Sequence, residues 1–205
     1  MAVERAMSTI SSFDPERRAA LRMTAAGAAA LAASFGQGRA QAATRTIAVE
    51  RLSVVSAKPF EAVVAAFESS IGRPDVNAFM KDLSATQTYE EMEKVVQQAI
   101  GKSGIMEFAR FDLGFILRKE PGGDDAKSLR FLIGNPLIMK EMAKHVADAG
   151  SYTPVTVLID KRADGVRLSY DKTASFLSLY GNADALQVAR DLDLKIENIC
   201  RTAAA

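Results

Sequence analysis

Few side chains in this sequence carry the chemistry that most enzymes need. The 205 residues contain one histidine, His145, and one cysteine, Cys200. A single histidine cannot supply a multi-histidine metal site, and a single cysteine excludes an internal disulfide and a cysteine-rich zinc cluster. Both residues fall late in expected helices, where structural roles are commoner than catalytic ones. In an exported protein Cys200 is also available to link two chains. We predict no metal site, assign no cofactor and favour a protein that is not an enzyme.

Polar side chains that are able to bind a ligand occur on two expected strands. Arg110 and Asp112 are two residues apart and should share a face, whereas Glu107 should face the opposite side in a regular strand. Tyr170 alternates with apolar residues, so its ring should point inward with a hydroxyl group that needs a partner. Asp171 follows it. An enzyme using a cleft of Arg110, Asp112 and Tyr170 is one hypothesis, and a surface ion pair that sets strand register is the alternative.

The triplet Gly134-Asn135-Pro136 is the sharpest short motif. Asparagine caps helices, and proline suits the first helical position. The same turn is able to hold an anion or polar ligand at exposed backbone N–H groups, so both interpretations stay open. No P-loop pattern occurs. The candidate ligand-binding residues, which share a polar side chain on or beside an expected strand, are Arg110, Asp112, Asn135, Tyr170 and Asp171.

The elements that position these residues follow from apolar spacing. Alternating and β-branched stretches predict strands, the last two of which form a hairpin, whereas stripes at i, i+3, i+4 and i+7 predict helices. Thr88 with Glu91 forms a capping-box pattern inside a helical subregion over 75–103. Residues 113–119 fit either a strand or a short helix. The expected strands are 46–56, 105–111, 129–133, 155–160 and 166–171, and further helices are expected from Pro59 to about Ile71, over 136–147 and after Asn182.

This order predicts a single α+β domain over 43–205, with two layers: a mainly antiparallel sheet and helices packed on one of its faces. The subregion 75–103 is a candidate lid over the open face of the sheet. Residues 202–205 should fray at the end of the last helix.

The N-terminal stretch has the features of an export signal. Arg17 and Arg18 precede a mildly apolar run over 23–35, which is far shorter than the ~20 residues that span a bilayer. An Ala-Gln-Ala triplet then ends at Ala42 and suits cleavage before Ala43. We predict a twin-arginine (Tat) signal over 1–42, with the Tat translocase and signal peptidase as partners, a periplasmic or secreted location and no stable membrane span. The alternative is an amphipathic N-terminal helix retained in the cytoplasm.

The overall balance of charge further limits the classes of function that the sequence allows. The chain has 26 basic and 25 acidic residues, a formal net charge of +1 and an apolar fraction of 48%. This composition supports a packed core and lacks the basic excess of a nucleic-acid-binding protein. We therefore expect no nucleic-acid partner.

Several stretches of the expected domain resemble a known family. FLIGNPLIMKEM (131–142), YTPVTVLID (152–160) and VRLSYDK (166–172) resemble the bacterial domain of unknown function 302, and SGIMEFARFDLG (103–114) fits the same family. The resemblance implies a two-layer α+β fold similar to the TATA-binding-protein-like or helix-grip folds, and no established activity. Leu113 and Val155 stand where some relatives carry His and Cys, so a metal or thiol role does not carry over. Residues 75–88 resemble a subfamily addition.

The leading hypothesis is therefore an exported, non-catalytic domain that binds a small or lipophilic ligand or a partner. The alternatives are the enzyme described above and a structural protein that self-associates. The oligomeric state stays open.

Overall fold

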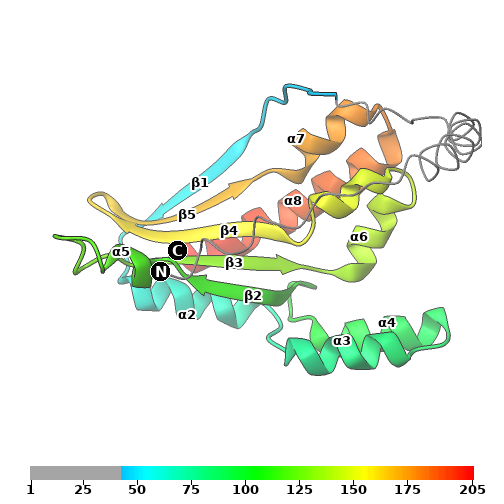
Figure 1. Cartoon of the computed structure of the whole chain (residues 1–205), viewed down its shortest axis with the longest axis horizontal. Helices are drawn as coiled ribbons and strands as arrows, with labels where there is room; N and C mark the ends of the chain where they lie inside the picture. Colours follow the sequence, from blue (N-terminus) through cyan, green and yellow to red (C-terminus); the bar gives the residue numbers. More distant parts are fainter. Residues whose placement is uncertain (1–42) are drawn as a thin grey trace, which may run out of the picture. The chain divides into compact units, whose positions relative to one another are not determined.

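A five-stranded antiparallel sheet is the centre of the fold, in agreement with the predicted α+β class (Figure 1). The computed structural model describes residues 43–205, so the predicted export signal with Arg17, Arg18 and Ala42 lies outside the described residues. The strand order is β1-β5-β4-β3-β2, and every neighbouring pair is antiparallel. The strands are β1 (Arg51–Ser56), β2 (Met106–Asp112), β3 (Ser128–Gly134), β4 (Val155–Arg162) and β5 (Gly165–Asp171).

Helices pack on one face of this sheet. The long helix α8 contacts β1, β5 and α2, and α2 contacts β4, so α2 and α8 cover the same face. Alternate strand residues such as Phe131, Val157 and Leu168 are fully buried there, as the period of two requires. The α-helices are α2 (Phe60–Ser70), α3 (Val76–Ala85), α4 (Tyr89–Ala99), α5 (Gly114–Leu117), α6 (Pro136–Ala143), α7 (Thr173–Leu177) and α8 (Ala183–Ala204), with 3₁₀ helices η1 (Ala147–Ser151) and η2 (Ser178–Tyr180).

The end of α8 is ordered, which contradicts the expected fraying over 202–205. Ala203 is fully buried, and the backbone carbonyl of Ala204 accepts a hydrogen bond of 2.7 Å from the Ser56 hydroxyl group. The last turn is fixed because it closes the core beside the end of β1.

The helical subregion consists of α3 and α4, and the predicted Thr88–Glu91 capping box is present. The expectation that it forms a lid over the open sheet face is wrong. Its apolar side chains, including Phe79 and Val96, form a separate small core with Met106 of β2, and α4 contacts α6. In Figure 1 the pair extends past the β2 side of the sheet. Within residues 43–205, no helix has the length and apolar character needed to cross a bilayer.

Candidate functional site

The five predicted ligand-binding residues do not converge. Arg110 and Asp112 belong to β2, Tyr170 and Asp171 to β5, and Asn135 lies at the start of α6. Two strands, β4 and β3, separate β5 from β2, and neighbouring strands lie ~4.8 Å apart, so the two sets are roughly 14 Å apart across the sheet. The structure therefore does not form the cleft of Arg110, Asp112 and Tyr170 that the enzyme hypothesis requires.

Arg110 belongs to a network of ion pairs that joins β2 to α2. A β-bulge between Glu107 and Ala109 inserts one residue into the strand, so Glu107 and Arg110 face the same side. The expectation of opposite faces is wrong for this reason. Arg110 pairs with Glu68 of α2, and its Nε lies 3.9 Å from Glu107. Arg73 pairs with both carboxylates, at 3.1 and 3.5 Å. The network fixes α2 and the following loop against β2.

Asp112 holds the short helix α5 at the end of β2. Its carboxylate accepts a hydrogen bond of 2.9 Å from the Phe115 backbone N–H and lies 2.9 Å from the Arg118 guanidinium. The Arg118 hydrogen bond lowers the pKa of Asp112. The sequence of residues 113–119 fitted either a strand or a short helix, and the structure forms a helix over 114–117.

Asn135 is a helix cap, as one of the two interpretations held. Its side-chain oxygen accepts from the Leu137 N–H at 2.8 Å, and its amide donates to the Gly104 carbonyl at 2.9 Å. The side-chain oxygen and the amide nitrogen of Asn135 are therefore both used in hydrogen bonds, which hold α6 against the loop before β2.

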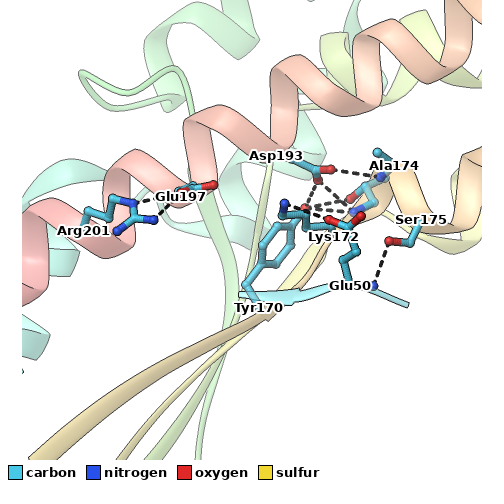
Figure 2. Close-up of polar contacts among 9 residues, drawn as sticks. Glu50, Tyr170, Lys172, Ala174, Ser175, Asp193, Glu197 and Arg201 are labelled. Carbon is cyan, nitrogen blue, oxygen red and sulfur yellow. Dashed lines mark hydrogen bonds and ion pairs between the residues drawn. The ribbon is translucent and has the colours of Figure 1, made fainter. Parts of the chain in front are cut away.

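Tyr170 points into the core, as predicted, and its partner is a buried carboxylate from α8. The phenol donates a hydrogen bond of 2.5 Å to Asp193, which is only 6% exposed (Figure 2). The same carboxylate accepts the backbone N–H groups of Thr173, at 2.8 Å, and Ala174, at 3.1 Å. These are the first two residues of α7, so Asp193 caps α7 from another helix. Burial raises the pKa of Asp193, and burial beside this carboxylate also raises the pKa of Tyr170.

Further contacts extend the network toward the surface. Lys172 Nζ lies 3.0 Å from the Glu50 carboxylate, and the Glu50 backbone N–H donates to the Ser175 hydroxyl at 3.0 Å (Figure 2). The segment before β1 is therefore joined to both ends of the first turn of α7. Together these contacts fix the position of a helix that is only five residues long.

The position of Asp193 in the sequence indicates a buried polar site, and the prediction did not include it. Asp193 lies at i+4 from Ala189 and i−3 from Ile196, inside the apolar stripe of α8. A charged residue at such a position must find buried partners. α7 itself was not predicted, because five residues carry too little periodicity to identify a helix.

The open face of the sheet carries a pocket with a volume of about 410 Å³. Asp171 lines it and is bonded to Arg51 through two hydrogen bonds of 2.6 and 2.7 Å. The Arg51 hydrogen bond lowers the pKa of Asp171. Arg130 of β3 also lines the pocket and, within residues 43–205, forms no ion pair. Sheet residues at the base of the pocket include Thr156, Leu158 and Ser169.

Two aromatic rings form one wall of this open-face pocket. Tyr152 stacks on Phe176 of α7, with ring centroids 4.9 Å apart and an angle of 11° between the planes. The Tyr152 and Tyr180 hydroxyl groups are hydrogen-bonded at 2.9 Å, and Tyr180 donates to Asp148 at 2.8 Å. The hydrogen bonds from Tyr152 to Tyr180 and from Tyr180 to Asp148 hold the Tyr152 side of this wall. The Asp193 cap of α7 holds the Phe176 side.

Of the predicted residues, Tyr170 and Asp171 line this pocket. Arg51, Arg130 and the two rings were not predicted, because only strand pairing and the placement of α7 bring them to the same pocket.

His145 and Cys200, the two remaining reactive side chains, do not line the open-face pocket. His145 is exposed just beyond α6, and Cys200 is fully buried in α8. Burial raises the pKa of the Cys200 thiol to about 12 and keeps it out of reach of a second folded chain. Among residues 43–205, no three His, Cys, Asp or Glu side chains are close enough to hold a metal ion.

The fold defines a class of α+β protein with one helix-covered and one open sheet face. The profile of the domain of unknown function DUF302 matches residues 81–203, so the chain belongs to this family. A crystal structure of an uncharacterised conserved DUF302 protein from Bacillus stearothermophilus is similar, with a TM-score of 0.52 and 9% sequence identity. The match covers 75% of this chain and 97% of that one. No curated protein matches the chain.

Proposed function

We propose that the domain binds a small organic anion with a flat apolar body in the open-face pocket. The observation that carries this proposal is that Arg130, which forms no ion pair among the described residues, lines the same pocket as the stacked rings of Tyr152 and Phe176. Arg51 is already neutralised by Asp171, so Arg130 supplies the net positive charge of the pocket. A guanidinium group recognises carboxylate or sulfonate oxygens, and aromatic rings favour a flat partner.

The size of the pocket supports a ligand smaller than most cofactors. Its volume of about 410 Å³ lies near the lower end of the ~300–1,000 Å³ typical of small-molecule sites. Apolar contacts come from Leu113 and Leu158 as well as from the rings. The pocket offers binding groups and no nucleophile paired with a base, which favours binding over catalysis.

A fluorescent aromatic sulfonate, 8-anilinonaphthalene-1-sulfonate, has the proposed chemistry and serves as the probe. We expect saturable binding to the purified protein, weakened about tenfold by Arg130→Gln, because a charge-assisted hydrogen bond contributes roughly 1.5–3 kcal/mol. Phe176→Ala should also weaken binding. Arg201→Gln is the matched control, since Arg201 pairs with Glu197 on α8 and does not line the pocket. Equal affinity in wild type, Arg130→Gln and Phe176→Ala would refute the proposal.

We also propose that the protein is exported by the Tat translocase and processed by signal peptidase before Ala43. The support is the Arg17-Arg18 pair, the apolar run and the Ala-Gln-Ala triplet of the sequence. Native mass spectrometry of protein from the periplasm tests cleavage and any copurified ligand together. A Lys-Lys replacement of the arginine pair should retain the full-length chain in the cytoplasm. Export that is unchanged in this variant would contradict the Tat assignment.

A further inference from the structure

A second hollow on the far side of the domain from the open sheet face has the composition of an anion site. It lies between the end of α2, the loop 101–104 and α8, with a volume of about 520 Å³. The polar side chains around it are all neutral or positively charged, and no carboxylate lines it. These side chains are Ser69, Ser70, Lys102, Ser103, Lys195, Asn198 and Thr202.

Two lysines supply the charge of this hollow. Lys102 comes from the loop and Lys195 from α8, and neither forms an ion pair within residues 43–205. Lys195 reaches toward the loop, because its Nζ lies 4.0 Å from the position that a Cβ atom on Gly104 would occupy. Gly104 has a φ of 76°, a backbone conformation that favours glycine. The chain is close to neutral overall, so a hollow with two cations and no carboxylate is a local concentration of positive charge.

A buried hydroxyl group provides an independent observation. Ser103 Oγ is inaccessible to solvent and has no hydrogen-bond partner among the described residues. Buried polar atoms nearly always have a partner, and those without one require an explanation. Ser103 lines the hollow, so a rotation of its side chain toward the hollow would let the hydroxyl group donate a hydrogen bond to an oxygen of a bound ligand, while the two ammonium groups neutralise the charge of that ligand.

We propose that this hollow binds a tetrahedral oxyanion, such as phosphate or the phosphate group of a small soluble molecule. Lysine is a common phosphate ligand, and hydroxyl and amide donors complete such sites. None of the strongly exposed large apolar side chains of the described chain lines the hollow, which favours a soluble anion over a lipid headgroup. The proposal is independent of the open-face pocket, because the two pockets share no residue.

The test is a titration of the ¹⁵N-labelled full chain with sodium phosphate, followed by NMR at ionic strength held constant with chloride. We expect saturable shifts of the backbone amides of Ser70, Ser103 and Gly104. Lys102→Gln and Lys195→Gln should each weaken binding about tenfold. The matched control is Lys81→Gln with Lys94→Gln, which removes two exposed lysines from α3 and α4 and should leave the affinity unchanged.

Ser103→Ala distinguishes a role of the hydroxyl group in phosphate binding from a role in the stability of the fold. Because the hydroxyl group makes no hydrogen bond in the ligand-free protein, this variant should keep or raise the thermal midpoint in phosphate-free buffer. Its phosphate affinity should nevertheless fall. Absence of saturable shifts in the wild type, or equal affinity in the Lys102→Gln, Lys195→Gln and Ser103→Ala variants, would overturn the proposal. Lysine-dependent binding to phosphatidylcholine vesicles containing phosphatidic acid, without any response to free phosphate, would overturn the assignment of a soluble ligand.

Discussion

The Tyr170 phenol and the Asp193 carboxylate are 2.5 Å apart, and this contact joins the sheet to the helix that covers it. Asp193 also accepts the first two N–H groups of α7, so β5, α7 and α8 meet at a single buried carboxylate. A buried charge is tolerated only when its hydrogen bonds are satisfied, and here the backbone and the phenol satisfy them. Through α7 the same carboxylate also helps to place Phe176, one of the two rings in the aromatic wall of the open-face pocket.

Removal of this carboxylate should destabilise the domain more than removal of the phenol. Asp193→Ala removes the acceptor of the Ala174 N–H and the shorter of the two acceptors of the Thr173 N–H, together with the carboxylate partner of the Tyr170 hydroxyl. Tyr170→Phe removes the phenol contacts and leaves the carboxylate with both backbone N–H groups. We expect losses of about 3 kcal/mol and about 1.5 kcal/mol in the free energy of unfolding, measured by urea denaturation. Asp191→Ala, an exposed residue two positions away on α8, is the control and should change stability by less than ~0.5 kcal/mol. A larger loss for Tyr170→Phe than for Asp193→Ala would contradict this account.

The raised pKa of Asp193 predicts a pH dependence of stability. Burial makes the folded protein bind a proton at the Asp193 carboxyl more tightly than the unfolded chain does. In the unfolded chain the pKa of an aspartate is ~3.9. The contribution of Asp193 to the free energy of unfolding is therefore greatest below about pH 4 and falls as the pH rises through the raised pKa. The free energy of unfolding of the wild type minus that of Asp193→Asn isolates the contribution of this carboxyl group. This difference should decrease as the pH rises through that window. A difference that increases with pH would show that the pKa of Asp193 is lowered in the folded state.

The elements that the sequence predicted well are those with long or regular patterns. The β4–β5 hairpin, the stripe of α8 and the Thr88–Glu91 capping box each depend on residues close together in the chain. The bulge at Glu107 was not predictable, because it arises from the pairing of β2 with β3 and leaves no mark on the alternation of β2. α7 was missed for a related reason: its stabilising cap, Asp193, comes from α8.

The candidate site was predicted less well than the fold. Asp171 was identified from its place after Tyr170, but its partner Arg51 lies on another strand, 120 residues away in the chain. Tyr152 and Phe176 come from different segments and stack only after the sheet and α7 are in place. Arg110 and Asp112 looked like ligand-binding residues because polar groups on a strand are conspicuous, yet both are used in fixing neighbouring helices.

Cys200 should be unreactive in the folded protein. Only the thiolate reacts with alkylating reagents or disulfides, and a pKa of about 12 leaves almost none at neutral pH. The side chain is also fully buried. We expect native protein at pH 8 to remain unmodified by iodoacetamide over hours, and the same protein in urea to be modified at its single cysteine within minutes, as read by mass spectrometry. Rapid labelling without denaturant, or a disulfide-linked dimer of the native chain, would contradict the buried position.

The junction between the α3–α4 subregion and the sheet should be intolerant of any side chain at Gly101. A Cβ atom there would lie 2.4 Å from the backbone nitrogen of Gly72, and the two glycines approach because both donate hydrogen bonds to the Ile105 carbonyl, at 2.8 and 3.0 Å. The clash is with backbone, so Gly101→Ala must displace the junction. We expect a loss of about 3 kcal/mol in the free energy of unfolding, comparable to severe overpacking of a core.

Gly150→Ala is the matched control for this substitution, since no atom beyond the adjoining backbone lies within 4 Å of the added methyl group. It should change stability by less than about 1 kcal/mol in either direction. If Gly101→Ala unfolds in urea at the same midpoint as Gly150→Ala, the close approach of Gly72 and Gly101 does not exist in solution. A loss confined to Gly101→Ala instead shows that the α3–α4 subregion is fixed to the sheet through this backbone contact, which is why it lies beside β2 and leaves the open face uncovered.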